Sequence, residues 1–292
     1  MIYSNRRDFL KASALGLGGI LLPNILKSAT VKDVGIQLYT LRNEIKKDLT
    51  GTLKTVASLG YKYVEGYYVD KGHFFGMKPK EFKSMLSDMG LIMNSNHVLS
   101  GRSQPEVKSS MANNWEKIVD DLLEAGVKYV VCPWIPEVER NTINDYKKLA
   151  DYLNQKGQYS KHKGIQLCYH AHDFELKPLK GQIPYDLLLS ETDRAFVQFE
   201  MDLYWVKKAG KEPQDYFEKY PGRFPLWHVK DMDKTDKQHY TEVGQGTIDF
   251  KKIFAESEKA GMKYFYVEQD ECANHPLKSA QISYNYLKGM EY

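Results

Sequence analysis

Between residues 34 and 288 the sequence repeats one pattern, a short apolar run typical of a β-strand followed by a longer segment typical of a helix. Some of the helical segments end in Leu-Gly or Ala-Gly directly before the next strand-like run, at Gly60, Gly126 and Gly261. Glycine there suits the left-handed conformation that ends a helix. The strand-like runs are residues 34–39, 61–67, 91–98, 127–134, 164–168, 196–203, 224–231 and 264–270. The helical segments are residues 49–59, 80–89, 114–125, 144–161, 184–190, 213–220, 249–260 and 276–288.

This repeat predicts a (β/α)₈ TIM barrel of class α/β, a single domain over residues 31–292. An open doubly wound sheet is the competing fold, but it usually carries a glycine-rich phosphate loop after its first strand. Residues 39–42 (YTLR) contain no glycine, which disfavours that alternative. The long polar stretch 231–246 is interpreted as an enlarged loop over the barrel mouth.

The N-terminus has the features of an export signal. Residues 5–11 (NRRDFLK) resemble the twin-arginine motif, and the apolar segment 12–22 is too short to span a bilayer comfortably. A short buried helix after a chance Arg-Arg pair is the alternative. We therefore expect residues 1–30 to be a twin-arginine-type signal peptide and the protein to be periplasmic. No cysteine lies directly after the apolar segment, so no stable membrane anchor is expected after processing.

Composition excludes some classes of function. The net charge of +3 over 292 residues gives no case for a nucleic-acid-binding surface. The cysteines Cys132, Cys168 and Cys272 form no CxxC pair, and their odd number does not suggest a disulfide framework. Cys168 is interpreted as a small core residue.

Ionisable side chains recur at the C-terminal ends of the predicted strands, where a barrel gathers its active-site groups. His170 and His172 lie two residues apart and so point the same way along a strand. Taken alone, this pair is equally consistent with satisfied core histidines, but carboxylates and a further imidazole follow at later strand ends. The candidate residues are Glu65, His97, His170, His172, Glu200, Asp202, His228, Lys230 and Glu268.

The chain resembles the sugar phosphate isomerase/epimerase family of the xylose isomerase-like TIM-barrel superfamily, over about residues 33–292. The motifs that carry the resemblance are YVE at 63–65, YHAHDFE at 169–175, FEMD at 199–202, HVKD at 228–231 and VE at 267–268. The family places one divalent metal ion (Mn, Zn, Co or Mg) among side chains of strands five to eight. By position the resemblance implies the ligands His170, Asp202, His228 and Glu268, with Glu175 as the alternative to His170.

The resemblance also implies a mechanism, with one departure. Ketose epimerases of this family use opposed glutamates on strands five and eight, and here only Glu268 is a carboxylate. His170 or His172 would replace the missing base, since imidazole has a suitable pKa. We expect Glu268, His172 and Lys230 to be catalytic, with Lys230 holding an oxyanion or hydroxyl. The expected substrate-binding residues are Tyr39, Glu65, His97, Trp134 and Glu200, and Tyr39 and Trp134 are expected to stack on a sugar ring.

The expected function is a metal-dependent isomerase or epimerase that abstracts a proton next to the carbonyl of a sugar through a metal-stabilised enediolate. A dehydratase or lyase acting on a keto-sugar, keto-glycoside or keto-inositol is the alternative within enzymes, because inosose dehydratases share the superfamily. A sugar-binding barrel without catalysis is the alternative from another class. DNA repair endonucleases of the superfamily need extra histidines, and Trp205 stands where they have one. No glycine-rich phosphate loop is present, which favours an unphosphorylated substrate.

Overall fold

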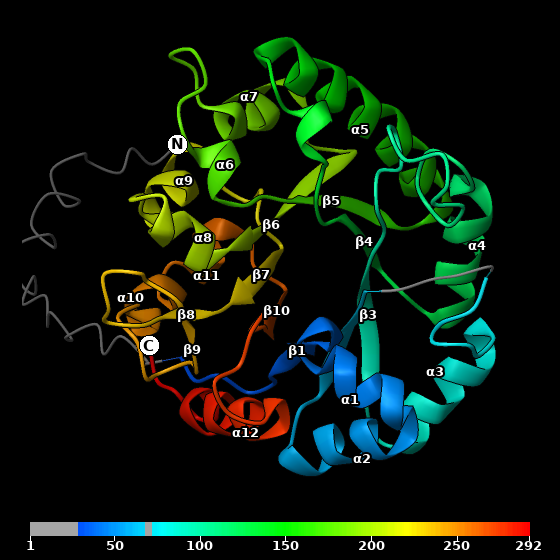
Figure 1. Ribbon diagram of the computed structural model, residues 1–292, viewed down its shortest axis with the longest axis vertical. Helices are drawn as coiled ribbons and strands as arrows, with labels where there is room; N and C mark the ends of the chain where they lie inside the picture. Colours follow the sequence, from blue (N-terminus) through cyan, green and yellow to red (C-terminus); the bar gives the residue numbers. More distant parts are fainter. Residues whose placement is uncertain (1–28, 68–71) are drawn as a thin grey trace, which may run out of the picture.

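The computed structural model describes residues 29–67 and 72–292, and within them eight parallel strands close into a barrel in the order β1-β10-β7-β6-β5-β4-β3-β2 (Figure 1). The predicted TIM barrel is therefore confirmed. The barrel strands are β1 (Gly35–Gln37), β2 (Tyr63–Gly66), β3 (Ile92–His97), β4 (Tyr129–Cys132), β5 (Gln166–His170), β6 (Val197–Asp202), β7 (Leu226–Val229) and β10 (Tyr264–Val267).

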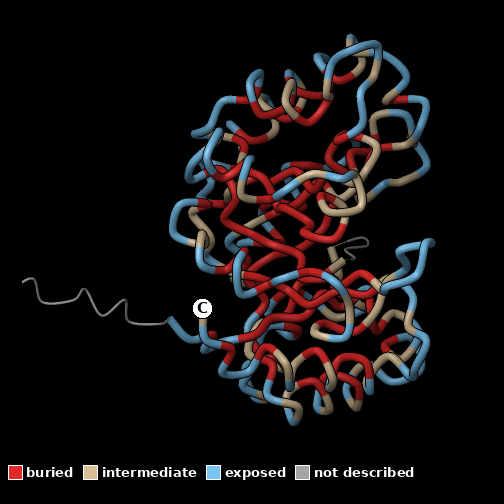
Figure 2. The backbone as a smooth tube through the Cα atoms, turned by 90° about the vertical axis from the view of Figure 1, so that its left-hand side faces the viewer, coloured by how far each residue is buried: buried red, intermediate tan, exposed pale blue. Residues whose placement is uncertain are grey.

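Helices surround the barrel, and Figure 2 shows buried backbone in the centre with the exposed residues at the periphery. The helices are η1 (Leu38–Leu41), α1 (Arg42–Lys47), α2 (Leu49–Leu59), α3 (Pro79–Asp88), α4 (Trp115–Ala125), η2 (Glu137–Glu139), α5 (Ile143–Lys163), α6 (Asp173–Leu176), α7 (Pro184–Glu191), α8 (Leu203–Lys208), α9 (Pro213–Lys219), α10 (Phe250–Phe254), α11 (Ser257–Ala260) and α12 (Pro276–Leu287). Within the described ranges, no helix combines the length and apolar character needed to cross a membrane.

Glycine ends the helices α2, α4 and α11, as the sequence predicts. Gly60, Gly126 and Gly261 have φ values of 103°, 83° and 79°, which side chains with a Cβ rarely adopt. The predicted helix 249–260 is divided into α10 and α11. The short helices α6 and α8 were not predicted. Helix α8 begins directly after β6 because Asp202 Oδ1 accepts hydrogen bonds from Tyr204 N and Trp205 N.

The interior of the barrel is apolar at its base. Val131, Cys168, Leu226 and Tyr266 form a buried cluster there, and the inward-facing tyrosines of β2, β4 and β10 pack against it. One inward position further along the strands, the side chains become ionisable, as in the step from Cys168 to His170. The apolar base therefore supports a polar layer towards the C-terminal ends of the strands.

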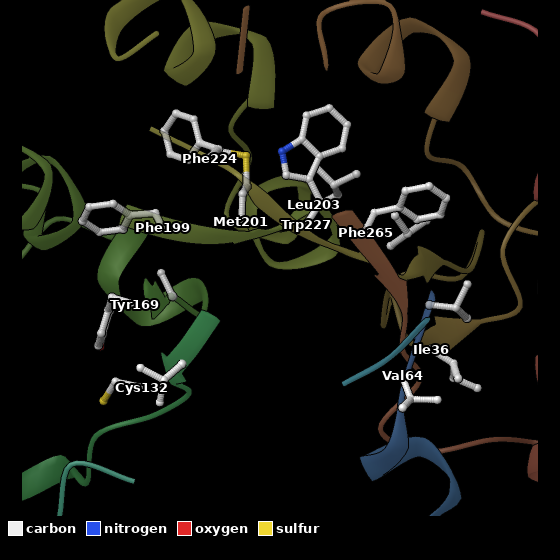
Figure 3. Packing of buried hydrophobic residues seen from close by; sticks show 14 of the residues in the cluster. Ile36, Val64, Cys132, Tyr169, Phe199, Met201, Leu203, Phe224, Trp227 and Phe265 are labelled. Atoms are coloured by element: carbon white, nitrogen blue, oxygen red, sulfur yellow. The ribbon is translucent and has the colours of Figure 1, made fainter. Parts of the chain in front are cut away.

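The outward faces of the strands pack against the helices, as Figure 3 shows for Phe199, Met201, Trp227 and Phe265. Trp227 is fully buried, stacks on Phe217 at 5.1 Å and meets Phe254 at 5.3 Å between ring centroids. The assignment of Cys168 to the core is confirmed, and Trp227 also belongs to the core.

The ends of the described chain lie side by side. Ala29 N donates to Tyr292 O and Tyr292 N donates to Ala29 O, both at 2.9 Å. The predicted signal boundary at residue 30 therefore falls inside a segment that pairs with the C-terminus. The twin-arginine motif and the apolar segment lie outside the described residues.

The stretch 231–246 is more ordered than the loop that was predicted. It contains an antiparallel hairpin of β8 (Asp231–Met232) and β9 (Tyr240–Thr241). The Asp231 carboxylate accepts hydrogen bonds from the backbone N–H groups of Met232, Gly244, Gly246 and Ile248. The hairpin could not be predicted from its polar composition, because it is held by the hydrogen bonds of one buried carboxylate and not by an apolar pattern.

Helix α5 makes a close approach that only glycine permits. A Cβ at Gly157 would lie 2.5 Å from Phe196 O at the start of β6. We expect Gly157→Ala to lower the free energy of unfolding by about 1–3 kcal/mol although alanine favours helix, because the backbones must move apart. Urea denaturation measures this, with the exposed Gln158→Ala in the same helix as the control. A Gly157→Ala protein at least as stable as wild type would contradict the packing argument.

Candidate metal centre and active-site cavity

Two buried carboxylates lie among imidazoles in the polar layer of the barrel. Glu65 Oε2 is 2.6 Å from His228 Nε2, and Glu200 Oε2 is 2.9 Å from His170 Nδ1. His97 Nε2 joins the two carboxylates, at 3.2 Å from Glu65 Oε2 and 3.0 Å from Glu200 Oε2. Each carboxylate therefore fixes the orientation of an imidazole that was predicted to bind metal.

The opposite nitrogens of the same imidazoles face the other predicted ligands. His228 Nδ1 is 2.9 Å from Glu268 Oε2, and His170 Nε2 is 3.7 Å from Asp202 Oδ2. Ligand atoms of Asp202, His228 and Glu268 lie within 4.8 Å of one another, and all of these residues are buried. The structure thus brings together the residues of the predicted metal site.

This donor set fits a divalent ion of the Zn, Mn or Co type, which accepts imidazole nitrogen and carboxylate oxygen. The nitrogens of His170 and His228 that point away from Asp202 and Glu268 are held by Glu200 and Glu65, which is the usual arrangement behind metal-bound histidines. Two buried carboxylates, Asp202 and Glu268, also supply the negative charge that such an ion requires.

Charge compensation sets the ionisation of this cluster. Burial opposes ionisation of Glu268, but Lys230 and His228 outweigh it and hold its pKa well below the usual range. Burial lowers the pKa of His97, but Glu65 and Glu200 raise it by more, so that its pKa is about 9. Burial and the neighbouring imidazoles hold the pKa of His170 well below its usual range. His97 is therefore cationic and His170 neutral near pH 7, and a neutral imidazole is the form that binds metal. Burial lowers the pKa of His228, but Glu200, Glu268 and Glu65 outweigh it and raise this pKa well above the usual value, so His228 must lose a proton when a metal ion binds.

Lys230 lies at the end of β7 on the same face as His228, as predicted, and is buried. Its ammonium is 3.0 Å from Asp202 Oδ2, 2.8 Å from Glu268 Oε2 and 2.7 Å from Asp270 Oδ2. Burial alone would lower its pKa, but these carboxylates raise it well above the usual value. Lys230 is not among the described residues that line the cavity. Its ammonium bends to the carboxylates instead.

A cavity of about 350 Å³ opens above the cluster at the C-terminal ends of the strands. Its described lining is Tyr39, Tyr67, His97, Leu99, Pro133, Trp134, His170, His172, Glu268 and Asp270. Tyr39 and Trp134, the predicted sugar-stacking residues, are both in its wall. Tyr39 is braced by Tyr67, edge to face at 5.4 Å between ring centroids.

Glu65 and Glu200 were predicted to bind substrate, but they lie deeper in the barrel than that role requires. Both are fully buried and neither lines the cavity, because each lies one layer down and contacts the imidazoles. From these positions Glu65 and Glu200 do not contact a substrate in the cavity directly. Depth in the barrel depends on strand stagger, which the sequence does not reveal.

His172 follows the end of β5 and lies in the cavity wall. Its ring stacks on Phe174, with centroids 5.5 Å apart and planes 4° apart, and touches His170 at 4.9 Å. Its Nδ1 has no hydrogen-bond partner in the part of the chain that the structure describes. Burial and then Lys230 lower its pKa to about 3, so the ring is neutral at pH 7.

Glu175, the alternative ligand to His170, lies outside the cluster. Tyr169 OH donates to Glu175 Oε1 at 2.6 Å, and His172 N donates to Glu175 Oε2 at 2.8 Å. Both carboxylate oxygens are thus engaged in holding helix α6 against β5. The alternative assignment of Glu175 as a metal ligand is wrong for this geometry.

Asp270 lines the cavity and was not among the predicted site residues. It lies two residues after Glu268 and bonds Lys230. The spacing that placed Lys230 beside His228 also relates Asp270 to Glu268, so the signal was present in the sequence. Leu99 and Pro133 were missed because neither carries ionisable chemistry.

Comparison with known proteins identifies the family. The profile of the xylose isomerase-like TIM barrel family matches residues 53–289. The chain belongs to this family.

Its relatives include curated and structurally characterised enzymes. Inosose dehydratase of Geobacillus kaustophilus (strain HTA426) is 25% identical over 271 residues, covering 80% of this chain and 85% of that protein. Inosose dehydratase of Clostridium beijerinckii is 29% identical over 163 residues, and the match spans about half of each protein (49% and 54%).

Solved structures show the same fold. A sugar phosphate isomerase/epimerase from Parabacteroides distasonis ATCC 8503 is 28% identical with a TM-score of 0.75, covering 88% of this chain and 94% of that one. The IolI protein, whose crystal structure holds a bound zinc atom, has a TM-score of 0.67 at 15% identity, covering 87% and 97%. The curated relatives are enzymes that process carbohydrates, and this chain is an enzyme of their family.

Glu175 gives the protein a pH-dependent stability. Burial raises its pKa from 4.5 to about 8, so the folded protein keeps a proton that the unfolded chain loses as the pH rises through this window. Stability therefore falls between these two pH values. Glu175→Gln mimics the neutral acid. As the pH rises through this window, we expect the free energy of unfolding of the variant to increase relative to that of wild type, by up to a few kcal/mol or about 1.4 per pKa unit. Urea denaturation from about pH 5 to about pH 9 measures the difference. A difference that does not change with pH would contradict the assignment.

Proposed function

We propose that this protein is a metal-dependent enzyme that abstracts a proton next to the carbonyl of a keto-sugar or keto-inositol. The observation that carries the proposal is a neutral imidazole, His172, in the wall of a cavity that also reaches the candidate metal ligands His170 and Glu268. The size of the cavity, about 350 Å³, suits a sugar ring.

The proposed roles follow from position. His172 takes the proton from the carbon next to the carbonyl, and Phe174 holds the ring in place by stacking. Tyr39 and Trp134 receive the sugar ring from the cavity wall, and Asp270 offers a carboxylate to its hydroxyl groups. Glu65 and Glu200 keep His228 and His170 oriented. A divalent ion held by His170, Asp202, His228 and Glu268 would supply Lewis-acid polarisation of the substrate oxygens.

Elimination is the outcome we favour after proton abstraction. In it the C–H electron pair forms a C=C bond and the bond from the β-carbon to its hydroxyl breaks. His172 passes the abstracted proton to the leaving hydroxyl, which departs as water. The relative that matches along most of this chain is an inosose dehydratase. His170 on β5 replaces the glutamate that an opposed glutamate pair would need for epimerisation.

Isomerisation or epimerisation is the second candidate. It is supported by the Parabacteroides distasonis structure, described as a sugar phosphate isomerase/epimerase. It shares the first proton transfer and differs only in that the proton returns to carbon. Product analysis separates the two reactions, because only elimination gives an unsaturated product.

Exchange of substrate hydrogen in D₂O tests the proposal. We expect metal-replete enzyme to exchange the C–H next to the carbonyl of a keto-inositol or keto-sugar, as seen by NMR. His172→Gln should lower this rate by roughly 10²–10⁴-fold, because the proton acceptor is lost. His162→Gln, on the exposed end of α5, is the control. Binding of sugar without exchange or product would instead favour the non-catalytic sugar-binding alternative.

Glu65 offers a test of the metal site that involves no substrate. We expect Glu65→Gln to weaken binding of Mn²⁺ or Zn²⁺ by about 10–100-fold, because His228 loses its anionic partner. Isothermal titration calorimetry measures this. Glu242→Gln is the control, since Glu242 is also buried but bonds Asn274 and Ser279 away from the imidazoles. Equal affinity in wild type and Glu65→Gln would show that Glu65 does not support the ligand set.

We further propose that the protein is exported to the periplasm, on the strength of residues 5–11 (NRRDFLK) and the apolar segment after them. Cell fractionation is the measurement, and a protein found only in the cytoplasm would contradict it.

A further inference from the structure

The ammonium of Lys230 contacts the same oxygen atoms that belong to the candidate metal site. It lies 3.0 Å from Asp202 Oδ2 and 2.8 Å from Glu268 Oε2. The other Asp202 oxygen, Oδ1, is already occupied by the backbone N–H groups at the start of α8. A metal ion at Asp202 must therefore use the oxygen that Lys230 approaches, so the two cations act on one pair of carboxylates.

Lys230 is enclosed on its other side by aromatic rings. Its ammonium is 5.5 Å from the ring centroid of Tyr240, 5.7 Å from Trp205 and 6.0 Å from Tyr204. Tyr240 belongs to the hairpin that Asp231 anchors. The lysine is 1% exposed, so its charge has no direct access to water and stays beside the carboxylates.

We propose that Lys230 is a built-in cation of the metal centre, which neutralises Asp202 and Glu268 before a metal ion binds and weakens the binding of that ion. Buried carboxylates without a partner destabilise a fold, and the ammonium removes that penalty. The same positive charge repels a divalent ion at the shared oxygens, and this repulsion is strong where water is excluded. The inference rests on the metal-binding part of the proposed function and on no assumption about the reaction.

The proposal predicts opposite effects of one substitution. Lys230→Met keeps most of the side-chain volume and removes the charge. The metal-free variant should melt at a lower temperature than metal-free wild type, because Asp202 and Glu268 lose their counter-ion. The same variant should bind Mn²⁺ or Zn²⁺ about tenfold or more tightly, because the competing charge is gone. A lysine that only positions the carboxylates would instead give weaker binding when removed.

The experiment compares wild type, Lys230→Met and Lys208→Met after removal of metal with a chelator. Lys208 is a matched control, because it lies 5.1 Å from the ring of Tyr204 and its ammonium donates to the Tyr204 hydroxyl and to the backbone carbonyl of Gln238 rather than to a carboxylate. Calorimetric titration with Mn²⁺ and with Zn²⁺ gives the affinities, and thermal melting with and without metal gives the stabilities. We expect Lys208→Met to bind metal like wild type.

Each outcome decides the proposal. Tighter metal binding together with a lower metal-free melting temperature supports it, and unchanged or weaker binding by Lys230→Met overturns it. If Lys230→Met does not fold without metal, Lys230→Gln is prepared in saturating Mn²⁺ or Zn²⁺, and failure of both variants to fold with metal also overturns it. If wild type binds neither ion, the metal part of the proposed function fails, and binding gained by Lys230→Met would still support the inference. Binding by neither protein overturns both.

Discussion

The site depends on two buried carboxyl groups, those of Glu65 and Glu200, held in the middle of the barrel by His97, His170 and His228. Carboxylates at this depth are tolerated only when paired and hydrogen-bonded. Their pairing fixes which nitrogen of His170 and His228 points towards the mouth. The positions of Asp202, Glu268 and the cavity wall above follow from that orientation, so the chemistry at the surface of the site is set one layer below it.

The apolar base beneath this layer is equally necessary. Val131, Cys168, Leu226 and Tyr266 fill the barrel interior and leave the ionisable residues only one direction of contact with solvent. Alternation along each strand then separates two environments, since Trp227 packs against helices while its neighbour His228 enters the polar layer. A shift of one residue in register would exchange them.

Much of the fold and of the ligand set could be predicted from the sequence. Glycine after each of several helices marked the boundaries of the units. The C-terminal ends of the parallel strands must converge, which brings Asp202, His228 and Glu268 together and places His170 beside Asp202. Depth and side-chain direction could not be predicted. Glu65 lies where the register between β2 and β3 shifts, and Lys230 bends towards carboxylates from other strands. Glu175 was a plausible ligand by spacing, but its hydrogen bond to Tyr169 shows that it faces a different part of the fold.

The closed base of the barrel limits how protons, water and substrate reach and leave the site. Because Val131, Cys168, Leu226 and Tyr266 below the imidazoles are fully buried, they leave a chain of water molecules no open path from the N-terminal side of the barrel. A proton that His172 removes can leave only towards the bound molecule or the mouth that this molecule covers. Substrate, product and solvent must all pass through the same opening at the C-terminal ends of the strands. The product would therefore have to leave before the proton on His172 could exchange with bulk water.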